Sequence, residues 1–233
     1  MGHKVGLLDA DVYGPNVPLM LGTNAQPRAV SNERIEPILA SGLESHLGRL
    51  PESWRQADHL ARTHAAPDHP PVSGLGRVGR VDYLVIDLPP GTGDVALSLV
   101  QTVPLTGAVV VSTPSDVSLQ DGRKAIEMFR QMKVDLIGMV ENMSYFVCPH
   151  CQHEIDIFSC GGAEKTAQQF GVRVPGSYSA RSELRKGGDT GKPAVLDGEN
   201  APHAKALYEF ARRVVARVDE IRAHSGDSVI QIQ

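Results

Sequence analysis

The sequence contains no run of about 18 apolar residues, so it predicts no membrane-spanning helix. Aromatic residues are scarce, at 5% with a single Trp, and there are only three cysteines among 233 residues. So few cysteines, two of them in a Cys-x-x-Cys pair, exclude a disulfide framework and favour a reducing compartment. An excess of basic charge is also absent, because 23 basic and 27 acidic side chains give a formal net charge of −4. We therefore expect neither nucleic acid nor an anionic membrane as a partner.

The remaining composition, 41% hydrophobic and 21% charged, is that of a globular protein able to bury a core. The first residues enter an apolar strand pattern at once, without the layout of a signal peptide. We expect a cytoplasmic protein.

Short apolar runs alternate with helical patterns along the chain. The predicted strands are Val5–Asp9, Val81–Asp87, Gly107–Ser112 and Leu136–Asn142, and the predicted helices are 94–103, 116–132, 163–170 and 201–224. Runs that are apolar on both faces are typical of a parallel sheet covered by helices on both sides. The alternation predicts an α/β fold with a doubly wound, mostly parallel sheet, formed by a single domain over residues 1–224. Residues 225–233 are expected to be a disordered tail.

Residues 44–80 depart from this pattern. They contain no Ile, Met, Phe, Tyr or Lys, but hold five Arg, four Pro and four of the nine His. A structureless stretch of this length inside a compact domain is uncommon. The segment is read either as a disordered surface insertion or as an aberrant piece of sequence.

Carboxylates follow two of the predicted strands, at the sheet edge where α/β proteins bind their ligands. Asp9 and Asp11 follow the first strand, and Asp87 begins the string Asp87-Leu-Pro-Pro-Gly-Thr-Gly-Asp94. An aspartate that ends an apolar strand before such a loop is the Walker-B arrangement, which holds Mg²⁺ beside nucleotide phosphates. Taken singly, each aspartate could equally be a helix cap, but the whole string favours the nucleotide interpretation. Asn142 follows a strand on the same side, and its amide could read a purine edge.

The second motif is Cys148-Pro-His-Cys151. Two thiolates at this spacing can bind one soft metal centre, but a closed zinc or cluster site needs about four ligands. Cys160 with His150 or His153 could complete a zinc knuckle, or a two-fold dimer could contribute two pairs. A redox dithiol normally heads a helix after a strand. Because this pair lies in a polar loop, metal binding is favoured, and Cys160 is taken as incidental.

Together these strings resemble the Mrp/ApbC-type iron–sulfur cluster carriers of the MinD-like P-loop ATPases. The resemblance covers about four fifths of the chain, and its most specific parts are the string ending at Asp94 and the cysteine pair. It rests on residues 5–16, 82–94, 141–151, 161–166 and 187–193.

The resemblance implies an ATP-dependent carrier that holds a [4Fe-4S] cluster between two subunits of a homodimer. The carrier would receive the cluster from assembly scaffold proteins and pass it to apo iron–sulfur proteins. It further implies roles for single residues. Asp11 would be the switch-I carboxylate near Mg²⁺ and the attacking water, with Asp9 beside it. Asp87 would be the Walker-B aspartate, Pro89 and Gly91 would belong to switch II, and Asn142 would touch adenine. The implied cluster ligands are Cys148 and Cys151.

Two departures from the family pattern stand out. The family opens with a Gly-Lys-Gly-Gly-Val-Gly-Lys-Ser/Thr loop between a strand and a helix, whereas Met1 falls where the second family strand begins. With the first strand, the loop and the first helix missing, we expect the chain as written neither to bind nor to hydrolyse ATP appreciably. Residues 44–80 and 173–182 replace apolar family segments, and we interpret them as paired frameshifts that would make the chain fold poorly.

Three functions follow. The first is a cluster carrier, ATP-driven in its complete form. The second is a metal or cluster scaffold that works without nucleotide, or a non-functional truncated relative. The third, a MinD-like positioning ATPase, leaves the cysteine pair without a role and is disfavoured.

Overall fold

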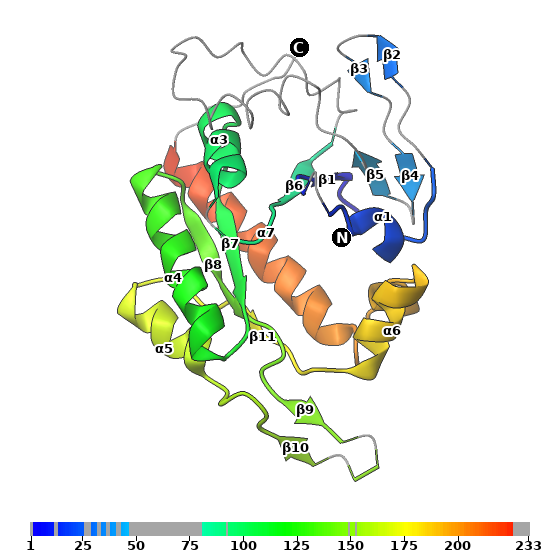
Figure 1. Cartoon of the computed structure of the whole chain (residues 1–233), viewed down its shortest axis with the longest axis vertical. Helices are drawn as coiled ribbons and strands as arrows, with labels where there is room; N and C mark the ends of the chain where they lie inside the picture. Colours follow the sequence, from blue (N-terminus) through cyan, green and yellow to red (C-terminus); the bar gives the residue numbers. More distant parts are fainter. Residues whose placement is uncertain are drawn as a thin grey trace. The chain divides into compact units, whose positions relative to one another are not determined.

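A computed structural model of the chain contains two compact units. The first unit comprises residues 1–103 and 185–193, and the second comprises residues 104–184 and 194–233. The residues that the structure describes are 2–11, 14–25, 29–31, 34–35, 38–40, 43–46, 81–91, 93–148, 150–151 and 153–225. Figure 1 labels their helices and strands.

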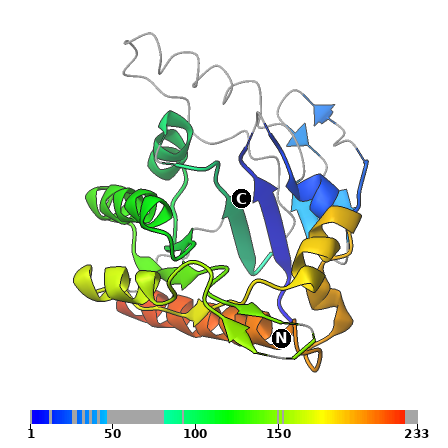
Figure 2. The ribbon, with the colours of Figure 1, turned by 60° about the horizontal axis from the view of Figure 1, so that its bottom comes forward.

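A four-stranded sheet in the order β4-β5-β1-β6 forms the centre of the first unit. Its strands are β1 (Val5–Asp9), β4 (Ile38–Ala40), β5 (Leu43–His46) and β6 (Tyr83–Asp87). Both β5 and β6 run parallel to β1, and β4 is antiparallel to β5. Figure 2 shows β1 and β6 side by side. Their register places Asp9 opposite Asp87, so two carboxylate-bearing residues end neighbouring strands at the same edge.

Short elements complete the first unit. They are α1 (Val17–Met20), α3 (Asp94–Thr102) and the antiparallel pair β2 (Ala29–Ser31) and β3 (Arg34–Ile35). Val17 of α1 is buried with Ile38 and Ala40 of β4, and the partly buried Leu7 and Leu21 pack against them. This small apolar cluster fixes the start of α1, and with it the loop that follows Asp9.

A three-stranded parallel sheet in the order β11-β8-β7 forms the centre of the second unit. Its strands are β7 (Ala108–Ser112), β8 (Leu136–Glu141) and β11 (Gly176–Ser177). The helices of this part of the chain are α4 (Asp116–Gln131), α5 (Gly162–Gln169), the 3-10 turn Ala194–Asp197 and α7 (Lys205–Ser225). A hairpin of β9 (Phe146–Val147) and β10 (Glu154–Ile155) lies between β8 and α5 in the sequence. The chain passes from the second unit to the first within helix α6 (Ser182–Thr190).

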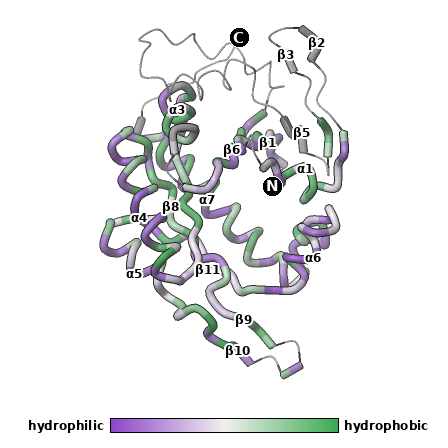
Figure 3. Tube along the Cα trace, viewed as in Figure 1, coloured by the Kyte–Doolittle hydropathy of each residue, from purple (hydrophilic) through white to green (hydrophobic). Residues whose placement is uncertain are grey.

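Apolar side chains at helical spacing cover the second sheet. Ile126 and Phe129 of α4 are 0% and 5% exposed, and Val218 and Ile221 of α7 are buried as well. Figure 3 shows apolar and polar residues alternating along both helices, as expected where one face of a helix packs against the core and the other meets water. The predicted α/β class with parallel strands is therefore confirmed, and the predicted strand Val5–Asp9 has the bounds of β1.

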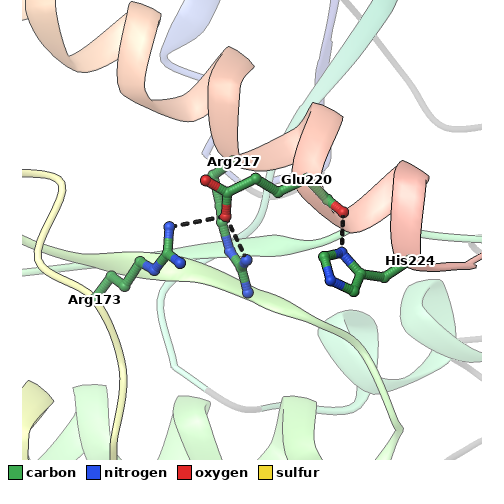
Figure 4. Close-up of polar contacts among 4 residues, drawn as sticks. All are labelled: Arg173, Arg217, Glu220 and His224. Carbon is green, nitrogen blue, oxygen red and sulfur yellow. Dashed lines mark hydrogen bonds and ion pairs between the residues drawn. The ribbon is translucent and has the colours of Figure 1, made fainter.

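The two segments that the sequence marked as aberrant differ in how much of them is described. Residues 44–46 belong to β5, whereas 47–80 lie outside the described residues, as do 226–233 of the expected tail. Residues 173–182 join the second sheet through β11, and the carbonyl of Arg173 accepts the Met139 amide at 2.8 Å. Arg173 also forms an ion pair with Glu220 of α7 at 2.9 Å (Figure 4). The frameshift interpretation and the single-domain expectation both stay predictions.

Candidate functional site

Asp9 ends β1 with a buried carboxylate that organises the loop after the strand. Its Oδ1 atom accepts the Asp11 amide at 3.0 Å, and its Oδ2 atom accepts the Val17 amide at 3.2 Å. The residue is only 5% exposed. The two amide bonds replace the hydrogen bonds to water that the carboxylate loses on burial. Asp9 therefore orders the backbone at Asp11 and at the start of α1. Its place in a nucleotide and Mg²⁺ site stays a prediction.

Asp11 lies in the loop that Asp9 holds. Its carboxylate oxygen Oδ1 accepts the Gly14 amide at 3.0 Å. A Cβ atom at Gly14 would lie 3.6 Å from the other oxygen, Oδ2, which is ordinary van der Waals contact. The loop thus holds a half-buried carboxylate in a defined orientation at the carboxyl end of β1.

Asp87 ends β6 directly beside β1, and its carbonyl accepts the Ala10 amide at 2.8 Å. Partial burial, and then the negative charges of Asp9 and Asp11, raise the pKa of the Asp87 carboxyl above its usual range. The loop that follows has Gly91 at a φ of +87°, a left-handed conformation that favours glycine. A Cβ atom at Gly91 would meet no atom within 4 Å, so the backbone conformation, not crowding, calls for glycine here.

The carboxylates at this edge do not by themselves form a metal site. Among the described residues, no group of three or more His, Cys, Asp or Glu side chains is arranged to hold a metal ion. Mg²⁺ is usually bound by one or two carboxylates together with phosphate oxygens and waters. Partial burial and then the charges of Asp9 and Asp11 raise the pKa of Asp87, and a cation nearby would oppose that effect.

Asn142 belongs to the second unit and follows β8 immediately. Its amide N–H donates to the Ser112 carbonyl at 2.8 Å, which fixes its backbone beside β7. Its side-chain oxygen accepts the Met143 amide at 3.0 Å. This bond engages one of the two lone pairs of the oxygen that could read a purine edge.

Cys148 and Cys151 lie on the loop of the β9–β10 hairpin. The strands pair Phe146 with Ile155, and the Cys148 amide donates to the His153 carbonyl at 3.0 Å, which closes the loop. All three cysteines are free thiols, Cys148 half-buried and Cys151 exposed. The sequence predicted a polar loop here but not the two-stranded hairpin that carries it.

Hydrogen bonds to sulfur favour the thiolate form of Cys148. The backbone of Cys151, then that of His150, and then the Cys151 side chain lower the pKa of the Cys148 thiol. Such donors stabilise a metal-bound thiolate as well as a free one. The pKa of Cys160 is raised instead, chiefly by the negative charge of Asp156. Because no third described donor joins the pair, the zinc knuckle within one chain has no support among these residues.

The structure thus separates the candidate residues into two groups. Asp9, Asp11, Asp87, Pro89 and Gly91 belong to the first unit. Asn142 and the two cysteines belong to the second, where a hairpin that begins four residues after Asn142 presents the thiols. Sequence reasoning passed over Glu141, the residue before Asn142, which ends β8 as a buried carboxylate. Its signal was available, because it ends an apolar strand with a carboxylate as Asp9 and Asp87 do.

The sequence matches the family described as ParA: NUBPL iron-transfer P-loop NTPase over residues 1–53 and 75–215. The chain belongs to this family. The resemblance inferred from the motifs is confirmed, and the match omits residues 54–74, within the segment that departs from the family pattern.

Curated relatives cover most of the chain. The iron-sulfur cluster transfer protein NUBPL of Mus musculus is 40% identical over 92% of this chain and 67% of its own length. The iron-sulfur protein required for NADH dehydrogenase, mitochondrial, of Arabidopsis thaliana is 38% identical over 99% of this chain and 73% of its own length. The iron-sulfur cluster carrier protein of Escherichia coli strain K12 is 36% identical over 93% of this chain. The chain spans only 59% of that bacterial relative.

Solved structures agree. A nucleotide-binding protein from Archaeoglobus fulgidus in complex with ADP has a TM-score of 0.68 and 34% identity, covering 89% of this chain and 80% of that one. The cell division ATPase MinD of Pyrococcus furiosus has a TM-score of 0.66 at 18% identity, covering 92% of this chain and 86% of its own, and shows the shared P-loop NTPase fold alone.

Proposed function

We propose that this protein is an iron–sulfur cluster carrier whose cargo, a [4Fe-4S] cluster, binds to Cys148 and Cys151. The observation that carries the proposal is the cysteine hairpin. It places two free thiols on one closed loop and supplies N–H donors to the Cys148 sulfur. The family membership and the names of the relatives support cluster transport over a redox or zinc role.

The cargo calls for a second copy of the chain. A [4Fe-4S] cluster is commonly held by four thiolates, and each hairpin supplies two. Because no third described donor joins the pair, two hairpins meeting at a cluster would satisfy the ligand count. We therefore propose a homodimer with the cluster between its subunits. A cluster held by so few ligands from each chain could be released to an acceptor when the two chains move apart.

ATP with Mg²⁺ is the proposed second ligand, at the carboxyl ends of β1 and β6. Asp87 and Asp11 would contribute oxygens to the Mg²⁺ shell, with Asp11 oriented by the loop that Asp9 holds. Pro89 and Gly91 lie in the loop after Asp87, and this loop would respond to the bound nucleotide. Asn142 would contact the adenine base. When bound, the nucleotide would supply the phosphate oxygens that the carboxylate pair needs to complete the metal shell.

The proposed partners are apo iron–sulfur proteins that accept the cluster and assembly scaffold proteins that supply it. Free thiols at all three cysteines suit a reducing compartment, and we propose the cytoplasm. Nucleic acid and membranes are not proposed as partners. Among the described residues, none of the helices is long and apolar enough to cross a membrane.

A second candidate is a cluster scaffold that works without nucleotide. One observation favours it: Cys148 and Cys151 belong to the second unit, whereas Asp11 and Asp87 belong to the first. Equilibrium binding of fluorescent ATP to the purified chain separates the two candidates. Micromolar binding that requires Asp87 would establish the nucleotide site, whereas cluster loading without ATP binding would establish the scaffold.

The cluster proposal is tested by anaerobic reconstitution with iron and sulfide. The wild-type chain should retain iron and sulfide and show broad absorbance near about 400 nm. The C148S/C151S double variant should lose both. C160S is the matched control, because it removes a thiol of raised pKa from the same segment, and it should load like the wild type. Equal loading of the double variant would refute the assignment of the ligands.

A further inference from the structure

Glu141 is a buried carboxylate that has no part in the site described so far. It is the last residue of β8, and its residue surface is 1% exposed. Its backbone is fixed from both sides, because it lies opposite Ser112 of β7 and Ser177 of β11. Its carbonyl accepts the Tyr178 amide at 2.8 Å. Backbone pairing on both sides therefore fixes the position of Glu141 at the end of β8.

The Glu141 carboxylate joins two places that are distant in the sequence. Its Oε1 atom accepts the Gly161 amide at 3.0 Å, and its Oε2 atom accepts the Ala163 amide in the first turn of α5 at 2.7 Å. The Ser144 hydroxyl donates to Oε1 from the other side. Both carboxylate oxygens are thus used, and the donors come from just before and just after the cysteine hairpin.

The segment between these donors carries the proposed cargo ligands. Residues 142–160 leave the sheet after Glu141, form the β9–β10 hairpin with Cys148 and Cys151, and return to α5. Its two ends contain non-glycine residues in the left-handed region, with φ of 56° at Met143 and 62° at Ser159. Side chains disfavour this conformation, and it persists only where the surrounding structure holds it. The Glu141 carboxylate binds next to both of these strained points.

We propose that Glu141 is a positioning residue for the cluster. It holds both ends of residues 142–160 against the end of β8, and so fixes the direction in which the hairpin presents Cys148 and Cys151. This inference rests on the proposed function and adds a residue that does not touch the cargo. It also gives the hairpin a rigid link to Asn142, the residue next along the chain.

The E141Q variant of the full chain is the primary test. A glutamine keeps the size of the side chain but has one acceptor oxygen, whereas the two backbone amides now bind two separate carboxylate oxygens. The NH₂ group of the glutamine would face one of these N–H donors. After anaerobic loading with iron and sulfide, two quantities are measured. They are the visible circular dichroism of the cluster and the rate at which an iron chelator removes it. We expect an altered spectrum and about tenfold faster loss, the lower end of what removal of an outer-shell partner costs a metal site.

The Y208F variant separates positioning from general stability. Tyr208 belongs to α7 in the same unit, and its hydroxyl donates to the Val195 carbonyl at 3.2 Å, outside residues 142–160. It should lower the melting temperature while leaving the cluster spectrum and the loss rate at wild-type values. Faster loss from both variants alike, or a wild-type spectrum and rate in E141Q, would overturn the proposal.

If E141Q does not fold, the S144A variant decides. It removes only the hydroxyl donor at the Met143 end and keeps the two amide bonds. Loss of the cluster several-fold faster than from the wild type supports positioning, and an unchanged rate overturns it. A wild-type chain that retains no iron would instead defeat the proposed function, and the positioning role would fall with it.

Discussion

Gly191 and Gly22 touch backbone to backbone, so closely that a Cβ atom on Gly191 would lie 2.2 Å from the Cα atom of Gly22. Both have positive φ, 68° and 65°. The contact joins the end of α6 to the turn after α1, within the first unit. The contact explains why position 191, in the string 187–193, is a glycine.

The G191A variant should therefore be strongly destabilised. It adds a clash with backbone, which cannot move aside like a flexible side chain, to the cost of a left-handed alanine. We expect the free energy of unfolding to fall by roughly 3 kcal/mol or more, measured by urea denaturation. G198A is the matched control, because Gly198 has a φ of 92° and open space around its Cβ position. It should lose about 1–2 kcal/mol, and equal losses in the two variants would contradict the packing argument.

Cys148 should react with iodoacetamide faster than Cys160 in the reduced, cluster-free chain. Exposure alone predicts the reverse order, because Cys160 is exposed and Cys148 is half-buried. The thiolate is the nucleophile, however, and the pKa is lowered at Cys148 and raised at Cys160. Mass spectrometry after short pulses at several pH values should show labelling of Cys148 beginning at lower pH. In the urea-unfolded chain the two rates should converge, and faster labelling of Cys160 in the folded chain would refute the prediction.

The parallel strands and the helices packed on them could be predicted because their patterns are local. Val5–Asp9 reads as a buried strand from its own residues, and Ile126 and Phe129 recur at helical spacing, so burial follows from sequence alone. The helix α6, with two adjacent glycines, was missed because tertiary contacts such as that of Gly191 with Gly22 stabilise the segment. The hairpin was missed because β9 and β10 have two residues each, too few for a visible period.

The candidate site divides in the same way. The identities of Asp11, Asp87 and the two cysteines follow from motif spacing. The contacts of Asp9 and Glu141 do not, because each depends on which amides converge on the carboxylate. The two oxygens of Asp9 accept the Asp11 and Val17 amides, and its predicted role in binding nucleotide or Mg²⁺ stays a prediction. Convergence of this kind is a property of the folded chain and leaves no pattern in the sequence.

The D87N variant should stabilise the ligand-free chain at neutral pH. Partial burial and the charges of Asp9 and Asp11 raise the pKa of Asp87, so the folded state binds this proton more tightly than the unfolded state does. Stability therefore falls as pH rises from the usual range of an aspartate through the raised pKa, and asparagine removes that loss. Thermal melts at pH 7 should show a higher melting temperature for D87N. The control D121N removes an exposed charge paired with Lys124 and should change little; a lower melting temperature for D87N would show that the carboxylate is stabilising.

The last prediction concerns Glu220, which holds the segment around Arg173 to α7. Its Oε2 atom lies 2.9 Å from Arg173 and 2.8 Å from Arg217, and its carbonyl lies 2.6 Å from the His224 ring (Figure 4). Hydrogen bonding from Arg217, followed by the charge of Arg173, lowers the pKa of Glu220. Stability from this group is therefore present above the usual pKa of a glutamate and is lost as pH falls through the lowered value.

E220Q should accordingly melt slightly below the wild type at pH 7, and the difference should vanish at pH values below the lowered pKa. Because the group is at the surface, added salt should also reduce the difference at pH 7. R185Q is the matched control, since it breaks an exposed pair with Asp189 within a single helix and does not link two segments. A difference in E220Q that is independent of both pH and salt would show that packing of the side chain, and not its charge, holds residues 173–182 to α7.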